Sequence, residues 1–125
     1  MDERHFFPKT ERLFLQKEID QLFDSGQSFI SYPLRIIFLS FPSEQATTTG
    51  ISVFISVPKK RIRHAVNRNR IKRLIREAFR LNKNLYRQEG KKIHIAYIYI
   101  CKEMKTYACI EKAVQKAFVM IAKRI

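Results

Sequence analysis

The spacing of apolar residues along the chain predicts three helices and four strands. Apolar side chains recur every three or four residues in three segments, which predicts helices at residues 14–24, 67–83 and 107–123. Ser25 and Gly26 follow the first of these segments and form a common helix stop. Runs rich in Ile, Val, Phe and Tyr predict strands at residues 27–31, 34–41, 50–57 and 93–101. Pro33 ends the short first strand, which favours a place for it at the edge of a sheet.

The elements follow one another in the order α-β-β-β-α-β-α, which predicts an α+β fold with helices packed on a small sheet. The 125 residues are enough for one hydrophobic core, so we expect a single domain over residues 1–125. We expect residues 1–10 to form a flexible tail and the polar segment 42–50 to be the least ordered loop.

Positive charge is concentrated just before and within the second predicted helix. Ten of the 22 residues from Lys59 to Arg80 are Lys or Arg, and Glu77 is the only acid among them. This segment therefore carries +9 of the chain's formal +14. Such a cluster attracts polyanions, of which the phosphate backbone of nucleic acid is the commonest in a cell.

The charges of this helix are also ordered around its axis. At 100° per residue, one face is apolar and consists of Ile71, Leu74, Ile75, Ala78, Phe79 and Leu81. The opposite face carries Asn69, Lys72, Arg73, Arg76 and Arg80, with Lys83 beside them and Arg70 and Glu77 at the flank. A solvated cationic face is the simpler explanation, but such faces normally intersperse Glu for i,i+4 pairing. We therefore predict nucleic-acid contact, with Arg68 and Arg70 exposed to make it.

Several function classes are disfavoured by the composition. No apolar run approaches the ~18 residues of a membrane span, and the first residues alternate acids and bases, so we expect neither a membrane segment nor a secretion signal. Cys101 and Cys109 are best read as reduced thiols of a cytoplasmic protein. His5, His64 and His94 suggest no acid-base pair, and the 11 acids are scattered, so catalysis by this chain alone is disfavoured. We expect His64 to add a hydrogen bond to RNA and His94 to have a structural role.

The basic segment also carries an ordered motif. A strand that begins at Gly50 ends in Lys59-Lys60, and Ala65-Val66 follow after a short loop. Next comes a helix that reads Arg-Asn-Arg and continues as Lys-Arg-x-x-Arg. Its motif residues are Arg68, Asn69, Arg70, Lys72, Arg73 and Arg76. This arrangement resembles the bacterial ribonuclease P protein subunit. Arg12-Leu13, Phe23 and Gly26 agree with that family in order and spacing, so the resemblance covers nearly the whole chain.

The resemblance implies an endoribonuclease in which a separate catalytic RNA performs the chemistry and removes the 5′ leader of precursor tRNA. It implies a mixed sheet, in which the basic helix connects two parallel neighbouring strands by a left-handed crossover. It also implies that Mg2+ is held mainly by RNA and that no catalytic residue lies in the protein itself. Asn69 is a candidate contact to Mg2+ because an amide oxygen can bind a hard cation or hold its waters. The residues expected to bind the RNA are Lys59, Lys60, Arg61, His64, Arg68, Asn69, Arg70, Lys72, Arg73, Arg76 and Arg80.

The leader is expected to run between the first helix and the sheet, near Ile19, Phe23, Ile37 and Phe38. Ile19 and Ile37 stand where other members often have aromatic residues, so here the chain departs from the family. Phe38, Tyr97 or Tyr99 would have to compensate, although core packing is the commoner role of any single aromatic residue.

Two other functions fit the charge. A structural RNA-binding protein, such as a small ribosomal protein, fits it equally well, and only the ordered motif argues against this alternative. A DNA-binding module would place the basic helix in a major groove and would be expected to form a two-fold dimer. The arginine-rich face is continuous and offers no dimer seam, so we expect RNA partners in the cytoplasm, with neither DNA nor a membrane.

Overall fold

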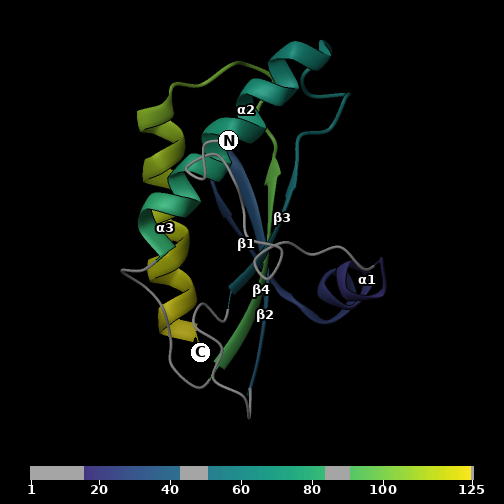
Figure 1. The fold of residues 1–125 in the computed structure, drawn as a ribbon, viewed down its shortest axis with the longest axis vertical. Coiled ribbons are helices and arrows are strands. Elements are labelled where there is room, and N and C mark those ends of the chain that lie inside the picture. Colours follow the sequence, from purple (N-terminus) through teal and green to yellow (C-terminus); the bar gives the residue numbers. More distant parts are fainter. Residues whose placement is uncertain (1–15, 43–50, 84–90, 125) are drawn as a thin grey trace, which may run out of the picture.

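A computed structural model describes residues 16–42, 51–83 and 91–124 of the chain (Figure 1). The elements occur in the predicted order, α-β-β-β-α-β-α. Their bounds are α1 Gln16–Ser25, β1 Gln27–Ser31, β2 Leu34–Pro42, β3 Ile51–Ser56, α2 Ala65–Asn82, β4 Lys91–Tyr99 and α3 Tyr107–Arg124.

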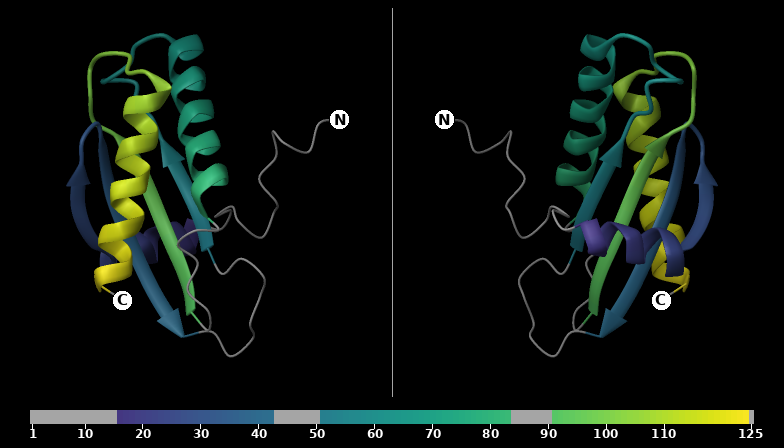
Figure 2. Two further views of the ribbon diagram at one scale, coloured as in Figure 1. Left: turned by 90° about the vertical axis from the view of Figure 1, so that its left-hand side faces the viewer. Right: turned by 90° about the vertical axis from the view of Figure 1, so that its right-hand side faces the viewer.

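The four strands form one mixed sheet in the order β1-β2-β4-β3. β1 pairs with β2 and β2 pairs with β4 in antiparallel fashion, whereas β3 and β4 are parallel. In the left view of Figure 2 these two strands run upward with α2 in front of the sheet, and β4 lies to the left of β3. The crossover is therefore left-handed, as the family resemblance implies and against the general preference for right-handed connections.

The helices are divided between the two faces of the sheet (Figures 1 and 2). α2 and α3 lie side by side on one face, and α1 lies on the other. Because side chains of a strand alternate between faces, Ile36 and Phe38 point to the α2–α3 face and Ile37 points to α1. The main core therefore lies under α2 and α3, and a smaller cluster under α1 consists of Leu22, Ile37 and Ala96.

Gly26 allows α1 to lie close to the sheet. A Cβ atom at this position would stand 2.4 Å from the carbonyl oxygen of Leu22 and 2.8 Å from Cγ2 of Ile37. The Gly26 N–H donates a 2.9 Å hydrogen bond to the same Leu22 carbonyl and so ends the helix. The chain therefore turns from α1 into β1 at a position that has no room for a side chain.

Several bounds differ from those predicted by spacing. α2 begins at Ala65 rather than residue 67, β4 covers Lys91–Tyr99 rather than residues 93–101, and β2 extends to Pro42. The predicted tail at residues 1–10, the start of the first helix at 14–15 and residues 43–50 of the predicted loop lie outside the described residues. Within the described residues, no helix has both the length and the apolar character to cross a membrane.

Candidate nucleic-acid interface

A short basic loop leads into α2, and Arg68 holds it in place. The guanidinium of Arg68 donates hydrogen bonds of 3.1 Å and 2.7 Å to the carbonyl oxygens of Ile62 and Arg63. The side chain of Ile62 is buried in the core, which fixes the middle of the loop. Arg68 is thus half-buried, and its prediction as an exposed residue was wrong, because its side chain folds back onto the loop.

The remaining basic residues of the loop lie around this anchor. Lys59 and Lys60 are exposed and Arg61 is partly exposed. His64 is the N-cap residue of α2; it is exposed and its side chain makes no capping hydrogen bond. The loop therefore presents cationic groups beside the first turn of the helix, where the helix dipole adds to the positive potential.

The helix α2 has the two-sided character that the spacing predicts, with one exception. Ile71, Ile75, Ala78 and Phe79 are buried, and Leu74 packs at the edge of the core. Leu81 does not share this face, because its side chain is 51% exposed. The buried position at this end of the helix is taken by Asn82.

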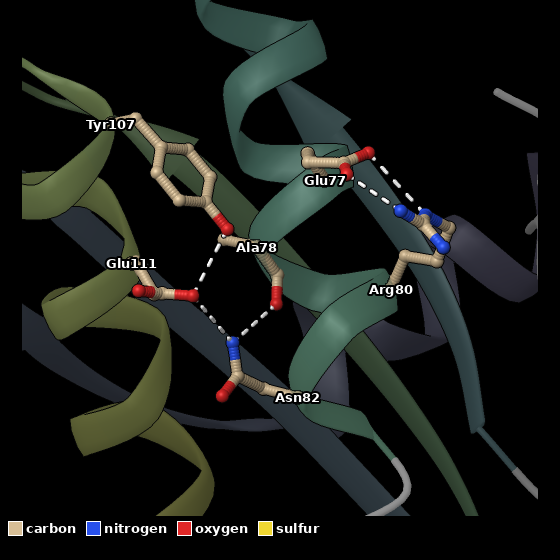
Figure 3. A network of polar contacts seen from close by, with 6 residues as sticks. All are labelled: Glu77, Ala78, Arg80, Asn82, Tyr107 and Glu111. Atoms are coloured by element: carbon tan, nitrogen blue, oxygen red, sulfur yellow. Dashed lines mark hydrogen bonds and ion pairs between the residues drawn. The ribbon is translucent and has the colours of Figure 1, made fainter. Parts of the chain in front are cut away.

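The opposite face presents polar groups that differ in exposure. Asn69, Arg70 and Arg73 are exposed. Lys72, Arg76 and Arg80 are partly exposed, which lets their long stems lie against the protein surface while the charged ends reach solvent. Glu77 forms an ion pair with Arg80, with 2.6 Å between the nitrogen and oxygen atoms (Figure 3). Such surface pairs are weak. Glu77 therefore neutralises part of the charge of Arg80, but a phosphate can replace Glu77 as its partner.

A polar network fixes the C-terminal half of α2 against α3 (Figure 3). The side-chain amide of Asn82 donates to the carbonyl oxygen of Ala78 at 2.8 Å and to Glu111 at 3.4 Å. Gln115 donates to the amide oxygen of Asn82 at 3.1 Å, and the hydroxyl of Tyr107 donates to Glu111 at 3.0 Å. Burial and this hydrogen bond raise the pKa of Tyr107 to about 12. The buried amide is therefore satisfied on both sides, and the basic helix has a fixed orientation.

A second surface lies where α1 meets the sheet. Ile19 is partly buried there, Phe23 is 43% exposed and Ile37 is buried beneath them. Phe38 is not part of this surface. It is buried on the α2–α3 face, because adjacent strand residues point to opposite sides of the sheet.

Tyr97 and Tyr99 also lie in the core on the α2–α3 face and do not compensate for Ile19 and Ile37. Burial raises the pKa of both hydroxyls, and that of Tyr99 donates to the carbonyl oxygen of Glu103. These two aromatic side chains are therefore structural.

Phe54 supplies an aromatic ring that the sequence reasoning missed on the α1 side. Its ring meets that of Phe23 edge to face, with 6.2 Å between the centroids and 82° between the planes. The alternation along β3 carries the signal, since Phe54 falls in phase with Ser52 and Ser56 rather than with the core residues. Arg35 lies exposed on the same side of the sheet and donates a 3.2 Å hydrogen bond to Ser28. A cation and two aromatic rings thus flank this surface.

Metal-binding and acid-base groups do not gather beside the basic helix. Within the described parts of the chain, no three His, Cys, Asp or Glu side chains are close enough to share a metal ion. His64 is exposed at the start of α2, whereas His94 is buried on β4, and His5 lies outside the described residues. The chemistry that the described residues support is binding of a polyanion.

Comparison with known proteins agrees with this conclusion. The family model for ribonuclease P matches residues 7–123. The ribonuclease P protein component of Porphyromonas gingivalis is 40% identical over 121 residues, which cover 94% of this chain and 87% of that protein. The ribonuclease P protein of Staphylococcus aureus superposes with a TM-score of 0.66 at 26% identity, over 92% of this chain and 97% of that one. The protein from Thermotoga maritima gives a TM-score of 0.66 at 25% identity over the same shares.

Proposed function

The chain belongs to the ribonuclease P protein family and is a subunit of that endoribonuclease, and from this premise we propose which RNAs it binds and where. The family's reaction is a metal-requiring hydrolysis that depends on RNA. We propose that the partners are the catalytic RNA of the enzyme and the 5′ leader of precursor tRNA. Residues 1–125 act in this proposal as one RNA-binding domain. The free thiols Cys101 and Cys109 fit a reducing compartment, so the proposed location is the cytoplasm.

In this proposal the exposed face of α2 binds the catalytic RNA. Arg70 and Arg73 project from a helix whose other face is buried in the core. A fixed helix loses little conformational freedom on binding, and each guanidinium can hold a phosphate through two hydrogen bonds. Lys59, Lys60, Arg61, His64, Asn69, Lys72, Arg76 and Arg80 extend this surface along the loop and the helix.

Arg68 has a different role in this proposal. Its guanidinium already donates to two carbonyl oxygens of the loop, so it holds Lys59–Arg63 in the shape that the RNA meets. Arg68 acts as a positioning residue, whereas Arg70 contacts RNA directly.

The leader lies in this proposal along the α1 side of the sheet. Phe23 and Phe54 present ring surface there and Arg35 adds a positive charge. Single-stranded RNA is bound by flat side chains under its bases and cations along its backbone, with each stack worth ~1–3 kcal/mol. Ile19 and Ile37 form the apolar floor between these groups.

Magnesium is the metal that we propose for the holoenzyme. Mg2+ requires near-octahedral oxygen coordination and usually carboxylate ligands. Asn69 offers one exposed amide oxygen, and no cluster of acids accompanies it among the described residues. The protein's donor groups therefore do not fit a resident magnesium site. RNA phosphates hold the metal in this proposal, and Asn69 at most contacts its hydration shell.

Cleavage of a 5′-extended precursor tRNA at low millimolar magnesium tests the proposed function. The protein alone, a bacterial ribonuclease P RNA alone and their mixture are compared. We expect cutting at the mature 5′ end to be efficient only in the mixture. If the mixture cuts no better than the RNA alone despite tight RNA binding, the protein is a structural RNA binder and the proposal is wrong.

Arg68 and Arg70 form a matched pair of variants for the α2 surface. Arg70→Ala removes a direct phosphate contact and should weaken assembly with the catalytic RNA by about 1–3 kcal/mol without changing stability. Arg68→Ala should weaken assembly and also lower the free energy of unfolding, because it releases two carbonyl oxygens of the loop. Equal stability of Arg68→Ala and Arg70→Ala in urea would show that the hydrogen bonds from Arg68 to the loop, which we call the Arg68 clamp, contribute nothing to stability.

A further inference from the structure

A groove lies at the β1 edge of the sheet. It runs between the outer edge of β1 and the helix α3, whereas α2 lies over the opposite part of the sheet near β3 (Figure 2). Its volume is about 660 Å³, and its nine lining residues include Phe29, Tyr32, Lys112, Lys116, Val119 and Met120. The α3 residues of this lining span nine positions, from Lys112 to Met120, or about 12 Å of helix.

Two aromatic side chains, Phe29 and Tyr32, line this groove. Tyr32, at one end of the groove, is 60% exposed. Phe29 forms the inner wall and packs edge to face on Phe38, with 6.0 Å between the centroids. The exposed ring of Tyr32 offers a flat surface on which a planar ligand can stack.

Four cations surround the groove. Lys112 and Lys116 line it from α3 and are both exposed. At one end the Nζ atom of Lys105 lies 5.9 Å from the centre of the Tyr32 ring, and at the other the guanidinium of Arg124 lies 5.1 Å from the Phe29 ring. None of the nine lining residues is acidic. The groove therefore favours a ligand that is both planar and anionic.

We propose that the groove between β1 and α3 is a second binding site for single-stranded RNA, in which a base stacks on Tyr32 and phosphates contact Lys112 and Lys116. Alternation of a cationic track with an exposed ring is the chemistry that binds single strands without sequence preference. This site rests on the proposed RNA-binding function but is separate from the α2 face and from the α1 side of the sheet. An acidic peptide added to the free edge of β1 is the competing occupant, but it would leave the exposed ring of Tyr32 without a stacking partner.

The test follows the site directly by NMR. The labelled full-length chain is titrated with a uridine tetranucleotide, and the ring signals of Tyr32 and the methyl signals of Val119 and Met120 are observed. We expect saturable shifts at all three. Absence of shifts at these groups, with shifts confined to α1 or α2, would overturn the proposal.

Two pairs of variants separate stacking and charge from general effects. Tyr32→Phe keeps the ring and should bind like the wild type, whereas Tyr32→Leu should raise the dissociation constant at these signals at least about fivefold. Lys112→Glu/Lys116→Glu should abolish the shifts. Lys102→Glu/Lys123→Glu changes the net charge equally at exposed positions outside the groove and should weaken binding far less. Equal losses in the two double variants would mean that net charge alone attracts the RNA, and the proposal would fail.

Two further measurements distinguish this proposal from binding of an acidic peptide and from RNA binding at α2. Displacement of the tetranucleotide by an equal concentration of hexaglutamate would assign the groove to acidic peptides instead. The groove shifts should persist in Arg70→Ala/Arg73→Ala, because those residues lie on α2. If precursor tRNA is cleaved normally with the catalytic RNA while the groove signals stay unmoved, the second site is refuted and the proposed function stands.

Discussion

The two faces of the sheet differ in how completely helices cover them. On the α2–α3 face Phe79 stacks on Phe118 at 5.9 Å and meets Tyr97 at 6.3 Å, and all three side chains are buried. On the α1 face Leu22 is buried, but Phe23 in the next position is 43% exposed. Aromatic side chains thus stabilise the fold on one face and remain available to a ligand on the other.

Element length explains the difference. α2 and α3 have 18 residues each, or about 27 Å of helix, which matches the ~30 Å of a nine-residue strand. α1 has ten residues, about 15 Å, and is the only described helix on its face. A short helix on a long sheet leaves apolar surface beside it, and such surface commonly marks a binding site.

The largest expected effect is a loss of stability on the α2–α3 face, which we call the closed face because two long helices cover it. Phe79→Ala should lower the free energy of unfolding by about 3–5 kcal/mol, because a large buried ring leaves a cavity among Tyr97 and Phe118. Denaturation in urea measures this loss. Phe23→Ala is the matched control on the α1 face, which we call the open face. Similar losses in the two variants would abolish the distinction between the faces.

The attachment of α1 gives the next largest effect. Gly26→Ala should destabilise the protein by about 2–3 kcal/mol, because its Cβ atom would collide with backbone at Leu22 and the side chain of Ile37. Ser25→Ala, at an exposed position next to it, is the control and should be nearly neutral. Hydrogen exchange should show the loss first in α1 and β1. Wild-type stability in Gly26→Ala would mean that α1 is not fixed by this close approach.

Much of the fold follows from periodicity alone. Element order and the buried face of α2 were predicted because apolar spacing depends on local geometry. Leu81 was placed wrongly because it lies at the margin of the apolar face, whereas Asn82 lies nearer the centre of that face and takes the buried position. The amide of Asn82 is satisfied there by Ala78 and by residues of α3. A polar residue buried through long-range partners gives no periodic signal.

The candidate RNA-binding residues could also be predicted from the sequence only in part. The exposed face of α2 was predicted from charge, since cations rarely enter a core. The clamp formed by Arg68 was missed because its partners are backbone carbonyls of a loop, which sequence does not place. Phe38 was assigned to the wrong face because strand register was unknown, although Phe54 was in phase with polar neighbours and could have been found.

On the open face, Phe23→Ala should weaken binding of leader-bearing precursor tRNA by about 1–2 kcal/mol, near the lower end for a stacked base. Binding of mature tRNA should change little, since it lacks the leader. The ratio of the two dissociation constants is the quantity to measure in the reconstituted holoenzyme. Equal losses on both RNAs would remove Phe23 from the leader site.

The smallest expected effect returns to the closed face and has the opposite sign. The hydroxyl of Tyr97 is buried, and no hydrogen-bond partner for it occurs within the described residues. Tyr97→Phe removes this polar atom and should raise the free energy of unfolding by up to about 1 kcal/mol at neutral pH.

The pH dependence of Tyr97→Phe provides an independent check. Burial raises the pKa of Tyr97 above its usual 10.0, so the folded state keeps the proton that the unfolded chain loses above pH 10. Tyr97 therefore makes stability fall as pH rises beyond 10, and Tyr97→Phe should fall less steeply while Tyr99 and Tyr107 still titrate. A variant less stable than the wild type at neutral pH would show that the hydroxyl has a partner. The ring on the closed face would then carry a polar interaction as well as its packing.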